Sequence, residues 1–181
     1  MRTLFLSAQG AATLISRVGL ARCIRGMVNE IDHDFKRWEQ FDKSARLASH
    51  SAQGVIEIMP ISDGQTYGFK YVNGHPNNHR HELPTVMAFG VLARVETGLP
   101  EFVSELTLVT ALRTAATSAL AAQHMANPAV RSMALIGNGA QAEFQALAFK
   151  AICGLTEVRL YDIDPLATAN CARNLAGSGL T

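Results

Sequence analysis

The chain has 181 residues, of which 48% are hydrophobic and 17% are charged, and its formal net charge is +1. This is the composition of a globular protein, long enough for one good core or two small ones. A net charge so close to zero gives no electrostatic footprint for nucleic acid or an anionic membrane. No apolar run is long enough to span a bilayer, so we expect neither nucleic-acid nor membrane partners.

The three cysteines, Cys23, Cys153 and Cys171, are odd in number and widely spaced. Because this spacing shows no pairing pattern, we expect free, buried thiols in a reducing cytoplasm. The first residues faintly resemble a secretory signal. Polar residues interrupt that apolar stretch, however, and a short strand followed by a helix is the better interpretation.

The first part of the chain indicates one helix and a run of strands. Apolar residues at helical spacing predict an amphipathic helix from about Arg22 to Phe41. Strand-like runs then follow in two pairs, each pair joined by a glycine-containing turn: Val55–Met59 with Tyr67–Val72, and Thr85–Ala93 with Phe102–Leu106. Because the runs are contiguous, we expect them to form antiparallel sheet.

The pattern changes after residue 107. An Ala-rich helix is expected from Leu108 to about Met125, where Asn127-Pro128 ends it. Strand and helix then alternate in four further elements: Arg131–Ile136, Ala140 to about Ile152, Val158–Asp162, and Pro165 to about Leu175. This alternation predicts the opening of a parallel α/β domain, whose sheet needs more than two strands. We therefore expect the chain to end inside that domain.

A glycine turn joins the first strand of this part to its helix. Residues 137–142 fit the pattern G-x-G-x-x-A, and Asp162 lies 20 residues after Ala142, at the end of the next strand. In such a turn the first glycine permits the tight bend, and the second lets the backbone approach a pyrophosphate. The helix N-terminus then holds the pyrophosphate, and the acidic residue binds the ribose hydroxyls. A carboxylate there repels a 2′-phosphate, so NAD is favoured over NADP.

Several charged residues lie among apolar neighbours. Arg113 falls in line with Val109, Ala116 and Leu120, so an anionic partner is expected, either a structural carboxylate or a ligand. Glu57 and Lys70 lie in the middle of strands, where alternation alone favours two water-facing side chains. Together with Arg46, they could instead form a cluster that suits a zwitterionic amino acid.

The segment from Asn73 to Glu82 contains three histidines and a glutamate, which are suitable metal ligands. Their spacing matches no closed motif, and the Gly, Pro and Asn residues among them indicate a flexible surface loop. We expect no metal site.

Eight segments together resemble the ornithine cyclodeaminase/mu-crystallin family, most closely its cyclodeaminase branch. They are 34–38, 41–46, 54–60, 69–76, 85–90, 104–107, 111–117 and 134–141. The similarity covers almost the whole chain and is weakest in the first two dozen residues.

The resemblance implies a substrate-binding and dimerisation domain over 1–127 and the first part of a Rossmann NAD-binding domain over 128–181. The fold class is thus α/β, with an α+β N-terminal domain followed by an incomplete Rossmann-like domain. Arg46, Lys70 and Arg113 are expected to bind the substrate, with Glu57 and Lys70 in catalytic positions. The expected cofactor contacts are Thr85, Arg113, Gly137, Asn138, Gly139, Ala140, Gln141 and Asp162.

The activity that the resemblance implies is the NAD-dependent conversion of L-ornithine to L-proline with release of ammonia, in a cytoplasmic homodimer. The family's acid/base aspartate is expected beyond Thr181, so that this chain alone lacks turnover. Two alternatives stay open. One is an NAD(P)-dependent amino-acid dehydrogenase or cyclic-imine reductase of the same family. The other is a non-catalytic nucleotide-binding protein like mu-crystallin.

Overall fold

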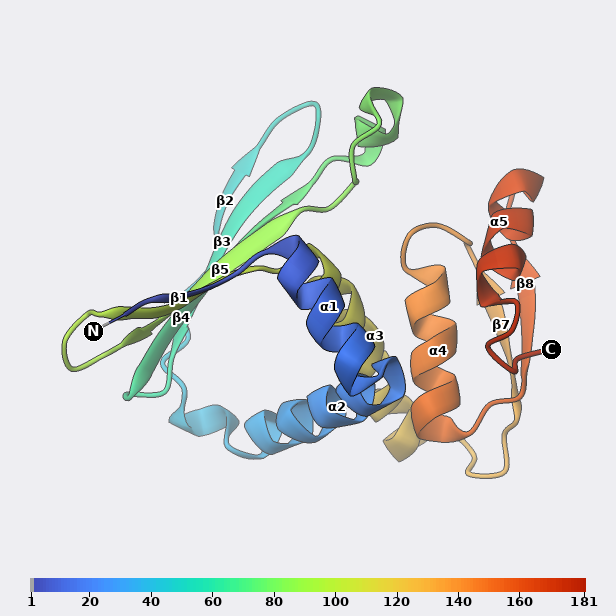
Figure 1. Cartoon of the computed structure of the whole chain (residues 1–181), viewed down its shortest axis with the longest axis horizontal. Coiled ribbons are helices and arrows are strands. Elements are labelled where there is room, and N and C mark those ends of the chain that lie inside the picture. The colour runs from blue at the N-terminus through green and yellow to red at the C-terminus, as the bar shows by residue number, and fades with distance from the viewer. Residues whose placement is uncertain (1) are drawn as a thin grey trace. The chain divides into compact units, whose positions relative to one another are not determined.

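The computed structural model describes residues 2–181 and divides the chain into two compact units (Figure 1). The first unit contains the residues up to Leu14 together with Phe35–Thr110. The second contains Ile15–Asp34 together with Ala111–Thr181. The expected domain boundary after residue 127 stays a prediction; the two units divide the chain differently because α2 and most of α3 belong to the second unit.

The first unit is built on a six-stranded sheet with the order β1-β6-β5-β4-β3-β2. Its strands are β1 (Leu4–Leu6), β2 (Leu47–His50), β3 (Val55–Ser62), β4 (Thr66–Gly74), β5 (Ala88–Arg94) and β6 (Pro100–Glu105). The strands from β3 to β6 pair antiparallel, as the sequence predicts. Strand β2 adds an antiparallel pairing to β3, whereas β1 pairs parallel with β6. The fold class is therefore mixed α/β.

Four local predictions need correction. The helix α2 (Leu20–Lys36) ends before Phe41, and a short 3-10 turn, η1 (Trp38–Gln40), follows it. The strand expected from Thr85 begins only at Ala88. Strand β2 was not predicted, because its four residues are all exposed and carry no alternating apolar pattern. The histidine segment contains a 3-10 helix, η2 (Pro76–His81).

The β3–β4 hairpin is held by the side chain of Asp63. Its Oδ1 accepts hydrogen bonds from the backbone N–H groups of Thr66 (2.8 Å) and Gln65 (3.0 Å). Arg37 adds an ion pair, with 3.4 Å from Nη1 to Oδ2. The backbone donors Thr66 and Gln65, and then Arg37, hold the pKa of the Asp63 carboxyl below its usual range. This turn fixes the register of the two longest strands.

The two faces of the sheet differ in chemistry. The residues of one face, here called the charged face, include Glu57, Met59, Lys70, Gly90 and Ser104, which the strand register places side by side. The opposite face, here called the aromatic face, carries six large apolar side chains that are 39–73% exposed: Phe5, Leu47, Ile56, Ile58, Tyr67 and Phe89. On it Tyr71 stacks on Phe89, with ring centroids 5.0 Å apart.

The second unit combines helices with a two-stranded parallel sheet. It contains the end of α1 (Ala8–Val18), helix α2 and most of α3 (Thr107–Met125). Its further elements are β7 (Ser132–Ile136), α4 (Ala142–Cys153), β8 (Glu157–Tyr161) and α5 (Pro165–Leu175). Each predicted element from residue 108 onward is present within two residues of its expected bounds. Val28 of α2 packs with Ala116 and Leu120 of α3 in one core.

A second core joins α4 and α5 to one face of the β7–β8 pair. Ala142 and Ala146 of α4 and Cys171 and Leu175 of α5 are buried there, packed against Leu135, Val158 and Leu160. Small residues on α4 allow the helix to lie close to the strands.

The three cysteines are free, as expected, but only Cys171 is fully buried. Within residues 2–181, no helix has both the length and the apolarity to cross a membrane.

Candidate functional site

The glycine turn lies where the sequence predicts it, between β7 and α4. Gly137 has a φ of +90°, in the left-handed region that a residue with a Cβ rarely adopts. Its N–H donates to the carbonyl of Tyr161 over 2.8 Å, which ties the turn to the end of β8. The backbone conformation at this position therefore requires a glycine.

Gly139 serves a different purpose. Apart from Gly139 and its two chain neighbours, no described residue has an atom within 4 Å of a Cβ built on it, so the space above its backbone is open. Ala140 and Gln141 follow at the exposed N-terminus of α4, and the side chain of Gln141 makes no capping hydrogen bond within the described chain. The first amides of the helix can thus donate to an anionic ligand that approaches over Gly139.

Asp162 lies directly after β8 and faces the turn. Its Oδ2 accepts a hydrogen bond from the backbone N–H of Asn138 (2.6 Å), and its Oδ1 accepts one from Asp164 (2.9 Å). The backbone donors of Asp164 and Asn138 hold the pKa of this carboxyl below its usual range. The group is therefore ionised at neutral pH, and each oxygen retains lone pairs for a ribose hydroxyl.

The side chain of Asn138 points into the protein, although the sequence places it among the cofactor contacts. Its Nδ2 donates to the carbonyl of Leu135 (3.2 Å), and its Oδ1 accepts from the hydroxyl of Thr168 (2.9 Å). The residue is only 7% exposed. Any contact of Asn138 with a ligand is thus left to its backbone. The sequence analysis missed Thr168, because a single threonine in a helix carries no recognisable signal.

On the charged face of the sheet, the structure brings Arg46 and Glu57 together. The Nη1 of Arg46 lies 3.2 Å from the Oε1 of Glu57. Glu57 of β3 pairs with Val72 of β4, and Lys70 lies two residues before Val72, on the same face of the sheet. The side chain of Glu57 is 21% exposed, so the water-facing position that alternation favours is wrong for it. The Arg46–Glu57 ion pair and Lys70 therefore lie on the same face of the sheet.

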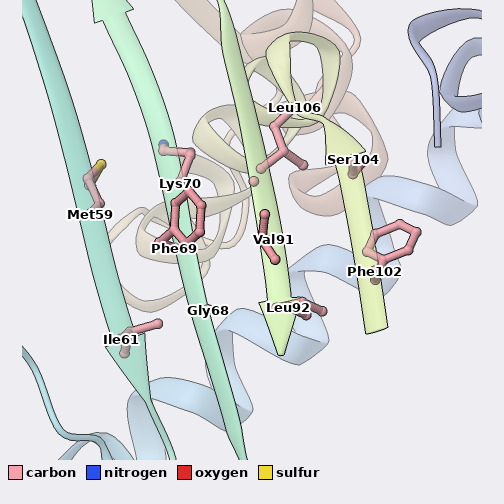
Figure 2. A pocket seen from close by; sticks show the side chains of 11 residues that line it. Met59, Ile61, Gly68, Phe69, Lys70, Val91, Leu92, Phe102, Ser104 and Leu106 are labelled. Atoms are coloured by element: carbon pink, nitrogen blue, oxygen red, sulfur yellow. The ribbon is translucent and has the colours of Figure 1, made fainter. Parts of the chain in front are cut away.

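Lys70 also borders a hollow of about 260 Å³ in the charged face (Figure 2). Its other lining side chains are mainly apolar, among them Met59, Ile61, Leu92, Phe102 and Leu106. Gly90 shapes this hollow, because a Cβ there would lie 2.5 Å from Leu106 Cδ1 and 2.8 Å from the carbonyl oxygen of Phe69. The combination of one ammonium group with an apolar wall is suited to a small organic anion.

Two further predicted residues lie outside both groups. Thr85 is exposed after η2, and its carbonyl accepts a hydrogen bond from the N–H of His75 (2.9 Å). Arg113 is an exposed residue of α3, although Ala116 and Leu120 on the same row are buried. The anionic partner expected for it stays a prediction.

Among residues 2–181, no group of three or more His, Cys, Asp and Glu side chains is placed to hold a metal ion. His75 instead shares a 2.9 Å hydrogen bond with Asn73, and His79 one of 2.9 Å with the carbonyl of Pro76.

The second unit has a strand, a glycine turn, a helix and a second strand, followed by an acidic residue. This arrangement is typical of the α/β folds that bind dinucleotides. Comparison with known proteins then defines the family. Residues 9–181 match the model of the ornithine cyclodeaminase/mu-crystallin family. The chain belongs to this family.

Individual relatives agree with this assignment. The chain is 58% identical over 175 residues to an ornithine cyclodeaminase of Brucella suis biovar 1 (strain 1330), an alignment that covers 97% of the chain and 49% of that protein. Among solved structures, a lysine cyclodeaminase superposes with a TM-score of 0.92 at 28% identity, over 100% of this chain and 55% of that one. An archaeal alanine dehydrogenase dimer with bound NAD gives 0.87 at 30% identity, over 100% and 55%. The chain thus spans about half the length of these relatives.

Proposed function

We propose that the whole protein converts L-ornithine to L-proline with release of ammonia, using NAD. The observation that carries this proposal is the charged face, where Arg46, Glu57 and Lys70 combine two cations with one carboxylate. An amino acid presents the complementary pair, an α-carboxylate and an amine. The identity of 58% to an ornithine cyclodeaminase supports ornithine as the substrate.

In this proposal, each charged residue has a distinct part. Arg46 and Lys70 bind the α-carboxylate, and Glu57 lies near the reacting amine, where a carboxylate can accept the proton that the amine must lose before it attacks. Arg113 contacts both substrate and cofactor. The apolar wall beside Lys70 excludes water and so strengthens these charge interactions.

The second unit supplies the cofactor site. We propose that Gly139, Ala140 and Gln141 bind the pyrophosphate through backbone N–H groups and that Asp162 binds the adenosine ribose. Gly137 and Asn138, whose N–H groups are bonded to Tyr161 and Asp162, would hold the turn in shape beneath the cofactor. Thr85 would be a further contact. The open space above Gly139 and the ionised Asp162 support this assignment. When bound there, NAD would supply reversible hydride transfer at the substrate α-carbon without net consumption of the cofactor.

The decisive experiment uses a chimera in which residues 1–181 replace the corresponding part of the Brucella suis relative. With L-ornithine and a catalytic amount of NAD, the chimera should form proline and ammonia in equal amounts over many turnovers. Stoichiometric consumption of NAD or NADH would instead indicate a dehydrogenase or reductase, and tight NAD(P)H binding without turnover would indicate a mu-crystallin-like role.

We also propose that the protein is a homodimer in which the aromatic face of one copy packs on that of another. Six large apolar side chains exposed on one sheet face form a surface that is costly to leave in water. The archaeal alanine dehydrogenase, which superposes over the whole chain, is described as a dimer. Sedimentation velocity of the purified protein tests this proposal, and a single species of monomer mass at micromolar concentration would contradict it.

A further inference from the structure

A closed set of hydrogen bonds links the glycine turn to the acidic residue that follows β8. The backbone N–H of Asn138 donates to Asp162, which also accepts from the N–H of Asp164. Asp164 caps α5 by accepting from Leu166 N (2.9 Å). Thr168, one turn into α5, returns to the turn through its bond to the side chain of Asn138. The ends of β7 and β8 and the start of α5, where these residues lie, belong to the second unit (Figure 1).

These hydrogen bonds constrain both the backbone and the side chain of Asn138. Its backbone is bound to Asp162, while its side chain is bound to Leu135 on one side and to Thr168 on the other. Because the residue is 7% exposed, water cannot readily replace a partner that is lost. A buried amide with an unsatisfied oxygen costs more than the bond itself is worth, so the turn would shift to find another donor.

We propose that Thr168 is a positioning residue that acts through Asn138 and holds the glycine turn at a fixed distance from Asp162. This inference rests on the proposed NAD site, where the turn would bind the pyrophosphate and Asp162 the ribose. One ligand spans both groups, so its affinity depends on their relative position. The half-buried Thr168 hydroxyl sets that position from a helix outside the glycine motif.

The test compares two substitutions in the full 181-residue chain. Thr168→Val keeps the shape of the side chain but removes the donor to Asn138, whereas Thr168→Ser keeps the hydroxyl. Thr156→Val is a matched control, because the Thr156 hydroxyl donates to a backbone carbonyl (Arg131, 3.4 Å) elsewhere in the second unit. NAD binding is measured by calorimetry, and exchange of the Asn138 and Gly139 amides by NMR in the absence of ligand.

Thr168→Val should weaken NAD binding roughly three- to tenfold and accelerate exchange of the Asn138 amide, since one buried hydrogen bond is lost. Thr168→Ser should stay within about twofold of the unsubstituted chain, and Thr156→Val should match that chain. A lower melting temperature of Thr168→Val with unchanged NAD affinity and unchanged Asn138 exchange would overturn the inference. If the unsubstituted chain binds no NAD, the proposed cofactor site fails, while the exchange measurement still decides whether Thr168 positions the turn.

Discussion

The guanidinium of Arg46 and the carboxylate of Glu57 form an ion pair, with 3.2 Å between Nη1 and Oε1, on a sheet face that also carries Lys70. The two partners are unequal, since the Arg46 side chain is 59% exposed and that of Glu57 only 21%. The arginine can therefore leave the pair without burying charge. A substrate carboxylate would compete with Glu57 for the same guanidinium and leave Glu57 available to the amine.

Replacement of Arg46 by lysine should separate binding from stability. An exposed ion pair contributes about 0–1 kcal/mol, so Arg46→Lys should change the free energy of unfolding by less than about 1 kcal/mol. A lysine cannot form a bidentate hydrogen bond to a carboxylate. The KM of the chimera for ornithine should therefore rise about tenfold or more. Steady-state kinetics decide the point. An unchanged KM for ornithine would remove Arg46 from the substrate site.

The state of Asp63 predicts a pH dependence of stability. Its carboxyl titrates near 3.8 when unfolded and lower when folded, because backbone N–H groups of Thr66 and Gln65 favour the ionised form. The stabilisation is therefore complete above the unfolded pKa and is lost as the pH falls through the folded pKa. Asp63→Ala should cost about 1 kcal/mol at pH 7 and progressively less below pH 4. Urea unfolding of both proteins at pH 7 and below pH 4 measures this cost. An equal loss of unfolding free energy at the two pH values would contradict the assignment.

The aromatic face gives a prediction with a matched control on the same strand. Phe89 and Leu92 of β5 are 45% and 47% exposed, but they lie on opposite faces of the sheet. Phe89→Glu should dissociate the proposed dimer, because a charge buried at an apolar interface has no partner. Leu92→Glu should leave the proposed dimer intact. Sedimentation velocity distinguishes them, and equal effects of the two substitutions would place the interface elsewhere.

The sequence allowed much of this fold to be predicted, and the misses have physical causes. The strands and helices after residue 130 follow from strong periodicity and from the glycine turn, whose local rules decide the structure. Strand β2 has no apolar alternation and exists because its backbone pairs with β3, a long-range interaction that no local pattern shows. The parallel pairing of β1 with β6, almost a hundred residues later, is hidden for the same reason.

The candidate site was only partly visible from the sequence. The motif identified Gly137, Gly139 and Asp162, because each has a fixed spacing that the fold demands. It could not show that the side chain of Asn138 turns inward, since this depends on Thr168, 30 residues away. The apolar row of Arg113 likewise did not show that the residue itself is exposed on α3.

The most direct test of the account is NAD binding by the chain and by Gly139→Ala. Among residues 2–181, the added methyl would meet no atom within 4 Å other than those of its own residue and its two chain neighbours. This variant should therefore keep the melting temperature of the unsubstituted chain. It would, however, occupy the space through which a pyrophosphate approaches the backbone, and NAD should bind at least about tenfold more weakly. Calorimetric titration of both proteins should show this difference. No NAD binding by the unsubstituted chain, or equal affinity of the two proteins, would contradict the proposed cofactor site.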